Sequence, residues 1–301
     1  MKEAVLLIAH GTVDDLGDLP AFLRNIRRGH DAGAELVAEL RRRYEAIGGS
    51  SPLLEITRSV TAKLEAQLGA PVRMAMRLWK PYPKDVLAEL SAERVVVLAL
   101  AQHSASVYLD AVKEAAPPGT ELVGVPNWGR EPALIDLFAA KVRHAVRAWS
   151  DAEREDTALV LSAHSLPQFI VDAGDSYEDE ARAAAEAVAE KVRDVLPDAR
   201  IAFQSQGMST GPRGKPVVWL GPDLPTVFDA VARDAKHRVL VAPIGFLADH
   251  VEVLYDLDLE AKAQADARGL KLFRTASLND DDGFVSVLAN LVRPHLRSAT
   301  S

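Results

Sequence analysis

Two histidines in this chain each follow an apolar run that has the length of a buried strand. Residues 6–12, "LLIAHGT", contain His10, and residues 159–167, "LVLSAHSLP", contain His164. Ligands of open parallel sheets bind beside the carboxyl ends of the strands. A neutral imidazole at such a place can accept a proton or bind a divalent transition metal. The alternative for either histidine is a structural role, in which the ring only hydrogen-bonds to its neighbours.

A row of carboxylates is the second candidate for chemistry. In the segment 243–265, Glu252, Asp256 and Glu260 follow one another at intervals of four residues. In an α-helix this spacing places all three carboxylates on one face. Their oxygens could hold or relay a divalent cation, and Glu252 paired with His164 would combine a base and a metal ligand in one site. A solvated acidic face is the alternative.

Basic and hydroxyl side chains gather near the start of the chain. Arginines lie in residues 25–29 ("NIRRG") and 41–44 ("RRRY"), and "IGGSSPLLE" follows at 47–55. The two serines and Pro52 predict a helix start, with Glu55 as a capping-box partner. The unpaired backbone N–H groups at a helix start can bind an anion, and arginines bind carboxylates through paired hydrogen bonds. These features predict a substrate with several carboxylates; a solvated basic helix is the alternative.

The elements that must position these residues alternate between strands and helices. Short apolar runs without polar alternation are typical of strands buried on both faces, and a helical pattern follows each run. The runs are 4–9, 71–76, 94–101, 121–126, 157–163, 199–203, 237–244 and 270–273. The helical patterns are 31–47, 54–68, 82–91, 105–115, 130–149, 175–195, 223–235, 247–268 and 281–296. The alternation predicts parallel sheets with right-handed crossovers.

A charged tract at 150–157, "SDAEREDT", is the expected boundary between two halves of the fold. We predict an α/β protein of two Rossmann-like lobes, residues 1–150 and 151–301, each a four-stranded parallel sheet flanked by helices. A ligand cleft is expected between the lobes. Both halves begin with a strand, Ala-His and a small residue, which is a weak sign of internal duplication.

Composition restricts the classes of function. The 301 residues carry a net charge of −8 and no basic block, so nucleic acid is not an expected partner. The absence of cysteine excludes disulfides, thiolate metal sites, cysteine nucleophiles and cysteine-ligated iron–sulfur clusters. No run reaches the roughly 18 apolar residues of a transmembrane segment, and residues 1–10 lack a signal-peptide pattern, so we expect a cytoplasmic protein. Walker A and dinucleotide fingerprints are missing, and "GMSTGPRG" at 207–214 is predicted as a loop.

Several stretches together resemble the ferrochelatase family. The most specific are "SAHSLP" and "GFLADHVEVLYD", and they are joined by "FLRNIRRG", "RYEAIGGSSPL", "NWGREP", "GDSYEDE" and "WLGPD" in one order along nearly the whole chain. The resemblance implies an enzyme of haem biosynthesis that inserts ferrous iron into a porphyrin bound in the cleft. It implies no cofactor beyond the substrate Fe²⁺, and the iron–sulfur cluster of some relatives is excluded here by the lack of cysteine.

The resemblance also assigns roles to the carboxylate row. The family's metal-inserting histidine matches His164, and its glutamate partner matches Glu252. Asp256 and Glu260 match the outer acidic residues, which would deliver the ion, carry protons away or hold an outer divalent cation. These four residues are therefore the expected metal ligands.

The porphyrin is expected to be coproporphyrin III. The short basic segment "NIRRGHDAG" is similar to that of the coproporphyrin III ferrochelatases of monoderm bacteria. Their porphyrin-holding positions match Arg27, Arg43, Tyr44, Ser51 and Tyr108. Coproporphyrin III carries four propionates against two for protoporphyrin IX, and cationic and hydroxyl donors favour the former. Protoporphyrin IX is the alternative substrate.

Two positions depart from the family pattern. His10 stands where coproporphyrin-type relatives carry tyrosine, so we expect it to contact the porphyrin and to be an axial ligand of iron in the product. Trp79-Lys80 replaces an expected lysine–histidine pair. A histidine at the first strand is also similar to the sirohydrochlorin cobaltochelatases. Such an enzyme, or a porphyrin- or metal-binding protein without turnover, is a further alternative. A transient partner from the haem pathway is also expected.

Overall fold

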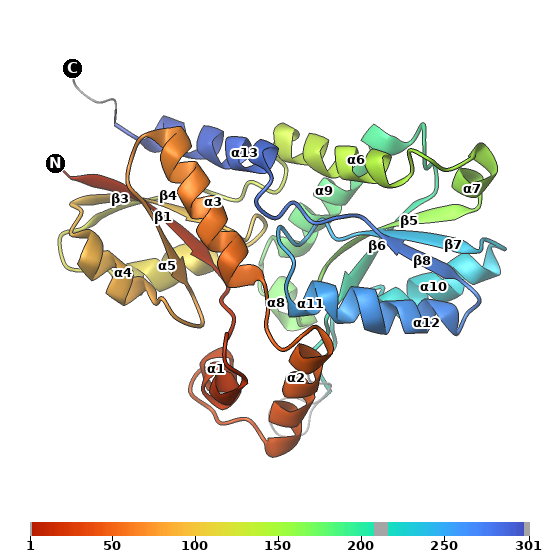
Figure 1. Cartoon of the computed structure of the whole chain (residues 1–301), viewed down its shortest axis with the longest axis horizontal. Coiled ribbons are helices and arrows are strands. Elements are labelled where there is room, and N and C mark those ends of the chain that lie inside the picture. Colours follow the sequence, from red (N-terminus) through yellow and green to blue (C-terminus); the bar gives the residue numbers. More distant parts are fainter. Residues whose placement is uncertain (1, 208–215, 298–301) are drawn as a thin grey trace. The chain divides into compact units, whose positions relative to one another are not determined.

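Two four-stranded sheets, each entirely parallel, form the framework of the chain (Figure 1). The structure is a computed structural model that describes residues 2–207 and 216–297, so most of the loop predicted at 207–214 lies outside the described residues. The first sheet contains β1 (Glu3–Ala9), β2 (Val72–Met76), β3 (Arg94–Ala99) and β4 (Glu121–Gly124). The second contains β5 (Thr157–His164), β6 (Ala199–Gln204), β7 (Arg238–Ala242) and β8 (Lys271–Arg274). All eight predicted strands are present, which confirms the α/β class.

Helices connect the strands in both halves. Around the first sheet these are α1 (Leu19–Ile26), α2 (Ala34–Ala46), α3 (Leu53–Leu68), α4 (Pro83–Leu90), α5 (Ala105–Ala115) and α13 (Asp282–Val292). Around the second they are α6 (Pro132–Ala145), α7 (Asp151–Glu155), α8 (Gln168–Asp172), α9 (Tyr177–Val192), α10 (Leu224–Arg233), α11 (Val251–Leu254) and α12 (Lys262–Asp266). Short helices α1, α7 and α8 were not predicted, because segments of eight residues or fewer carry little periodic pattern. No helix in the described parts of the chain is long and apolar enough to cross a membrane.

The two sheets have the same strand order, which makes the two strand-end histidines equivalent in topology. The orders are β2-β1-β3-β4 and β6-β5-β7-β8. In each sheet the chain leaves the first strand to one side and then crosses to the other, so the switch point lies beside β1 and beside β5. His10 follows directly after β1, and His164 is the last residue of β5. Each histidine therefore stands at the ligand-binding end of its own sheet, as predicted.

The sheets are buried because apolar helix faces cover them. Leu6 of β1 belongs to a cluster that includes Val86 of α4 and Val112 of α5. Val160 of β5 belongs to a matching cluster with Phe228 of α10. Burying each such side chain stabilises the fold by about 1.5–3 kcal/mol, so the strand ends stand on rigid supports.

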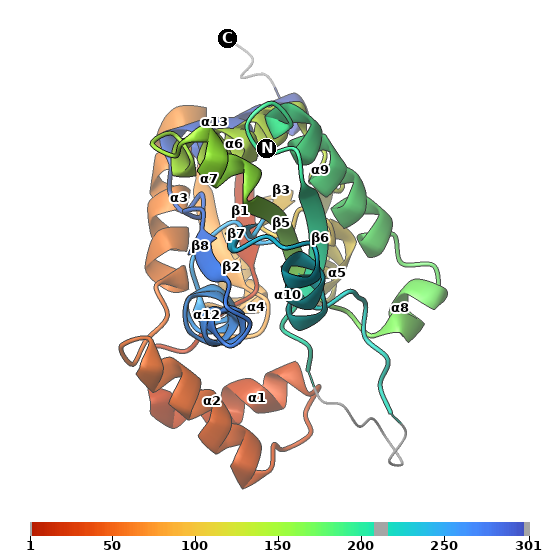
Figure 2. The same ribbon diagram turned by 90° about the vertical axis from the view of Figure 1, so that its right-hand side faces the viewer.

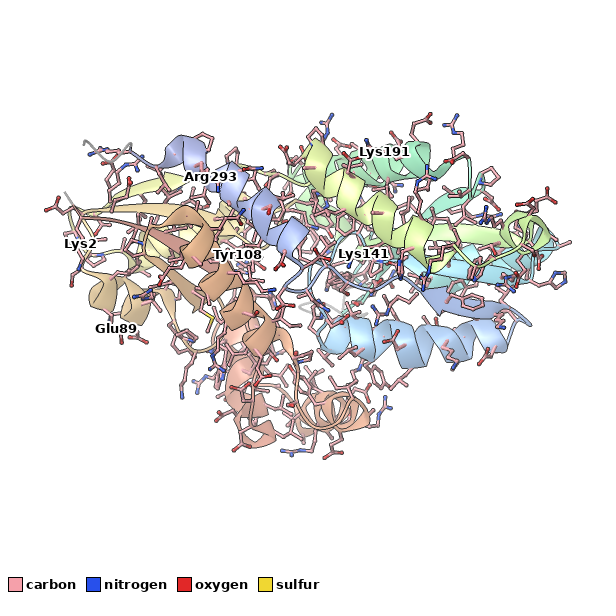
Figure 3. The ribbon with its side chains drawn as sticks, turned by 45° about the horizontal axis from the view of Figure 1, so that its top comes forward. Lys2, Glu89, Tyr108, Lys141, Lys191 and Arg293 are labelled. Carbon is pink, nitrogen blue, oxygen red and sulfur yellow. The ribbon has the colours of Figure 1, made fainter. Side chains whose placement is uncertain are left out.

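The chain divides into two compact units whose limits differ from the expected boundary at residue 150. Unit 1 runs to Trp128 and also contains Ala248–Val251 and the chain from Asn279 onward, while unit 2 takes Gly129–Leu247 and Glu252–Leu278. The reason is packing: α13 lies along α3, and α6 lies along α9 (Figure 1). Lys191 of α9 also pairs with Asp136 of α6, Nζ to Oδ1, at 2.5 Å (Figure 3). The charged tract at 150–157 is not a linker, because it forms the capped helix α7.

Helices α1 and α2 pack on each other with a small core of their own (Figure 2). Trp79, which replaces an expected lysine, is buried in it, with ring centroids 6.0 Å from Phe22 and 6.4 Å from Tyr82. Tyr44 belongs to the same cluster. The departure at Trp79 is therefore structural: an indole fills the core that supports the basic helices.

The segment that carries the predicted carboxylate row is not one α-helix. Helix α11 ends at Leu254, a π-helical turn spans Asp256–Ala261, and α12 continues from there. In the turn, the Glu260 amide donates to the Tyr255 carbonyl at 3.0 Å, five residues back rather than four. The expectation of a continuous α-helix over 247–268 is wrong at this point.

Candidate active site

His164 is held in one orientation by its own loop. Its Nδ1 lies 2.5 Å from the carbonyl oxygen of Ser165. Since a carbonyl only accepts hydrogen bonds, Nδ1 carries the hydrogen and the neutral ring has its lone pair on Nε2. The His164 carbonyl in turn accepts a hydrogen bond of 2.8 Å from the Tyr177 hydroxyl on α9. Backbone position and tautomer are thus both determined, and Nε2 is the nitrogen that can act as a base.

A carboxylate faces that nitrogen. Glu252 Oε1 lies 3.4 Å from His164 Nε2, as the sequence predicted when it paired the two residues. The side chains are 38% and 32% exposed, so both remain accessible to a ligand. When Nε2 takes up a proton it becomes a donor to the carboxylate, which stabilises the imidazolium. The pair is therefore arranged to accept a proton and hold it.

A turn at Gly245 brings the chain that carries Glu252 close to His164. A Cβ atom on Gly245 would lie 2.6 Å from Ala163 Cα, closer than real atoms approach, so the chain after β7 passes directly over β5 only because residue 245 is glycine. On the other flank of β5, Gln204 is in register with His164 and donates its Nε2 to the Glu252 carbonyl at 3.1 Å. A glycine directly after a predicted strand is the sequence signal for such a close turn.

The electrostatics of the pair raise the pKa of His164. Burial by itself lowers this pKa, but the Glu252 carboxylate, the Ser165 carbonyl and the more distant Asp256 carboxylate outweigh it. The net pKa lies above the ordinary value of 6.5. At neutral pH the imidazolium form is therefore more populated than in an isolated histidine, and the basic form grows as pH rises.

The other two carboxylates of the row differ in exposure. Asp256 is buried and accepts a hydrogen bond of 2.5 Å from the Ser205 hydroxyl, whereas Glu260 is exposed. The row therefore runs across the π-helical turn from a buried carboxylate to an exposed one. Within residues 2–207 and 216–297, no group of three histidine, aspartate or glutamate side chains is placed to hold a metal ion.

The end of β1 carries a different arrangement. His10 is exposed, and its Nδ1 lies 3.2 Å from the hydroxyl of Tyr108, which is buried on α5 (Figure 3). The Arg77 guanidinium lies 5.4 Å from the centre of the Tyr108 ring. Two of the predicted porphyrin-contacting residues, His10 and Tyr108, are thus brought together, and the phenol orients the imidazole.

The basic helix α2 contains an internal partner for its arginines. Arg43 Nε donates to Glu39 Oε1 at 2.8 Å, and Arg42 donates to both oxygens of the same carboxylate at 2.8 and 2.9 Å. The hydrogen bond from Arg42 and then that from Arg43 lower the pKa of Glu39 to about 2. Sequence reasoning missed Glu39, although it stands four residues before Arg43, the spacing of a helical ion pair.

The other predicted porphyrin contacts lie around the same helices. Tyr44 is buried, with its hydroxyl 2.9 Å from the Thr12 hydroxyl. Ser51 is buried at the start of α3, where its Oγ accepts from the Leu53 amide at 3.3 Å. Pro52 is the N-cap of α3 and no side chain caps it, so the predicted capping box is wrong. Arg27 is partly exposed directly after α1.

Comparison with known proteins settles the family. A family model described as ferrochelatase matches residues 2–296. The chain belongs to the ferrochelatase family. It is a metal chelatase, a lyase of haem biosynthesis whose family acts on a porphyrin and Fe²⁺. The family match removes the sirohydrochlorin-type enzyme and the binding protein without turnover from the alternatives.

Curated ferrochelatases of both named kinds are similar to the chain over nearly its whole length. A ferrochelatase of Herpetosiphon aurantiacus is 36% identical over 97% of this chain and 98% of the relative. A coproporphyrin III ferrochelatase of Anoxybacillus flavithermus is 34% identical over 97% and 96%. A ferrochelatase of Deinococcus radiodurans is 32% identical over 96% and 94%.

Solved structures share the fold. CbiX, described as the terminal enzyme of siroheme biosynthesis in denitrifying bacteria, aligns with a TM-score of 0.57 at 17% identity over 98% of this chain and all of its own. A multi-domain protein of Deinococcus radiodurans with structural similarity to chelatases aligns with a TM-score of 0.55 over 99% of this chain and 56% of its own. The two-sheet ferrochelatase fold is therefore that of the chelatases.

Proposed function

We propose that this enzyme inserts Fe²⁺ into coproporphyrin III to form coproheme, with His164 and Glu252 as the catalytic residues. The observation that carries the proposal is the pair itself: a strand-end imidazole with its lone pair on Nε2, 3.4 Å from a carboxylate oxygen. Insertion of a divalent ion requires the two pyrrole N–H protons to leave. His164 takes up the two protons one after the other on Nε2, and Glu252 stabilises each imidazolium and passes its proton outward before the next is taken up.

The same two side chains bind the incoming ion when His164 is neutral, before the pyrrole protons are taken up. A carboxylate and a neutral imidazole are both ligands of Fe²⁺, and replacing the waters of the ion with them prepares it for the porphyrin nitrogens. Asp256 and Glu260 supply the ion to this pair, or hold an outer divalent cation. Because Asp256 is buried and Glu260 is exposed, we assign Glu260 to the outer end of the path and Asp256 to the inner end.

Four residues of unit 1 are proposed to bind the propionates: Arg27, Arg43, Tyr44 and Ser51. Arg43 supports this assignment because Glu39 already occupies its guanidinium with a carboxylate, the group that a propionate would present. A propionate would replace Glu39 at a low cost, since exposed ion pairs contribute only about 0–1 kcal/mol. A substrate with four propionates gains more from such donors than one with two, which favours coproporphyrin III over protoporphyrin IX.

His10 is proposed as the axial ligand of iron in the bound product. Metal-ligating histidines commonly hydrogen-bond through their second ring nitrogen, and the Tyr108 hydroxyl is such a partner for His10 Nδ1. Iron would then bind at Nε2.

A side-by-side assay tests the proposed function. The full chain is supplied with coproporphyrin III or protoporphyrin IX, each with Fe²⁺, Zn²⁺ or Co²⁺, and metalation is followed by porphyrin absorbance. We expect a higher kcat/KM for coproporphyrin III, at least about tenfold if two further propionates are each held by a charged hydrogen bond. Equal or higher kcat/KM for protoporphyrin IX would contradict the substrate assignment. Binding of both porphyrins without metalation would contradict the reaction.

A further inference from the structure

The end of β6 contacts the carboxylate segment at two consecutive residues. Gln204 is buried and donates its Nε2 to the Glu252 carbonyl at 3.1 Å. Ser205 follows directly and donates its hydroxyl to Asp256 Oδ2 at 2.5 Å. One contact holds the backbone of the residue that faces His164, and the other holds the side chain of the next carboxylate.

Ser205 adopts a backbone conformation that a serine rarely takes. Its φ angle is 59°, in the left-handed region, where a residue other than glycine is strained. Strand β6 ends at Gln204, so this angle turns the chain at the point where the hydroxyl meets Asp256. Glycine would be the unstrained residue for such a turn, but it has no hydroxyl.

Asp256 stands where its helix changes register, and Ser205 supports its side chain from outside that helix. It is the first residue of the π-helical turn, where the regular α-helical register is interrupted. Its carboxylate is buried, and a buried carboxylate requires hydrogen bonds to keep it in place. The neighbouring Asp258 is held from a separate strand, by Arg274 of β8 at 2.6 and 2.9 Å.

We propose that Ser205 is a positioning residue for metal transfer: its hydroxyl holds the Asp256 carboxylate in the orientation from which the ion passes to Glu252 and His164. This inference rests on the proposed role of Asp256 in the metal path. Ser205 acts only through Asp256, and therefore affects the metal and not the porphyrin.

The test uses the full chain with coproporphyrin III and Zn²⁺, which is stable in air. Ser205→Ala is expected to raise KM for Zn²⁺ about tenfold, the worth of a hydrogen bond to a charged group, while KM for the porphyrin stays unchanged. Ser205→Gly distinguishes the effect of the hydroxyl from that of the backbone strain. It relieves the strain but also lacks the hydroxyl, so its KM for Zn²⁺ should resemble that of Ser205→Ala. Ser205→Asn keeps a donor and tolerates the left-handed region, and should restore part of the loss.

A serine in unit 1 provides a matched control. Ser91 also has a left-handed φ angle, 45°, but its hydroxyl donates to the Ala88 carbonyl at the end of α4. Ser91→Ala and Ser91→Gly should leave KM for Zn²⁺ unchanged. Thermal unfolding of every variant identifies any loss of fold.

A double-mutant cycle decides whether Ser205 works through Asp256. The KM for Zn²⁺ of Ser205→Ala/Asp256→Asn should equal that of Asp256→Asn alone, because removing the carboxylate removes what the hydroxyl positions. If the increases in KM for Zn²⁺ caused by the two single substitutions multiply in the double variant, the inference is wrong. It is also wrong if Ser205→Ala leaves KM for Zn²⁺ unchanged.

The two proposals fail in different ways. If the wild-type chain metalates no porphyrin, the proposed function is wrong, and calorimetric titration of Zn²⁺ into the substrate-free variants still tests the Ser205 contact. There the inference requires weaker Zn²⁺ binding in Ser205→Ala than in wild type, and equal binding would refute it. If the wild type turns over and Ser205→Ala matches it in every constant, only the Ser205 inference is wrong.

Discussion

The ends of β1 and β5 occupy the same place in two sheets of identical strand order, yet they carry different chemistry. At β5, His164 Nε2 faces the carboxylate of Glu252, and its Nδ1 is bound to a backbone carbonyl. At β1, His10 Nδ1 meets the hydroxyl of a buried tyrosine. A carboxylate partner raises the proton affinity of an imidazole, whereas a neutral phenol mainly orients it. The comparison teaches that topology places a histidine at the strand end, and that its partner determines how readily the imidazole takes up a proton.

The largest expected difference between the two ends is in catalysis. His164→Ala should lower kcat for metalation by a factor of about 10² to 10⁴, because it removes the base and a metal ligand together. The assay is porphyrin absorbance with Zn²⁺ or Fe²⁺, with near-ultraviolet circular dichroism as a check of the fold. Turnover near the wild-type level would remove His164 from the mechanism.

His10→Ala should keep turnover within about tenfold of wild type, a smaller loss than that of a general base. Its main effect is expected in the spectrum of the iron product complex, which should lose nitrogen ligation from the protein. Tyr108→Phe is the matched variant: it keeps the ring and removes only the hydroxyl that orients His10. Nitrogen ligation that survives His10→Ala would exclude this histidine as the axial ligand.

The pH dependence distinguishes a carboxylate-coupled histidine from a free one. Since the pKa of His164 is raised, kcat/KM should fall on the acid side with a midpoint above pH 6.5. Glu252→Gln removes the charge that favours the imidazolium, so this midpoint should move to lower pH while the maximal rate falls. The stability that the protonated pair contributes is present below the unfolded pKa and is lost as pH rises through the folded pKa. If the midpoint of the acid-side fall in kcat/KM is the same in Glu252→Gln as in wild type, Glu252 does not raise the pKa of His164.

Replacing an arginine of α2 is expected to change KM less, and to a different extent for the two porphyrins. Arg43→Ala should raise KM about fivefold for coproporphyrin III and less for protoporphyrin IX, because it removes one charged hydrogen bond to a propionate. Steady-state kinetics with both porphyrins measure the difference. An equal change for both substrates would contradict a role of Arg43 in selecting coproporphyrin III.

The smallest predicted effect is that of the carboxylate which competes for the same arginine. Glu39→Gln should lower KM for coproporphyrin III about twofold, since the exposed ion pair that a propionate must replace is weak. Glu45→Gln on the same helix changes the charge equally without a contact to Arg43 and serves as the control. An increase in KM for Glu39→Gln would mean that Glu39 orients Arg43 for the substrate rather than competing with it.

The sequence alone determined the eight strands, the two parallel sheets and the pairing of His164 with Glu252. Uninterrupted apolar runs of this length are typical of strands that are buried on both faces, and the strand-end motifs are specific to one family. The limits of the two units did not follow from the sequence, because the tract at 150–157 is charged and yet forms a capped helix. The return of α13 to the first sheet depends on packing against α3, which leaves no local signal.

Tertiary structure decided the details on which the chemistry depends. The spacing of Glu252, Asp256 and Glu260 predicts a row of carboxylates, but only the structure shows that a π-helical turn interrupts it and that Asp256 is buried while Glu260 is exposed. The tautomer of His164, the approach of Gly245 to Ala163 and the hydroxyl of Ser205 on Asp256 all join residues that are separated in the chain or depend on backbone angles. Residue types set which groups can bind a proton or a metal ion. Contacts across the fold set which of them meet, and so which histidine can act as the base.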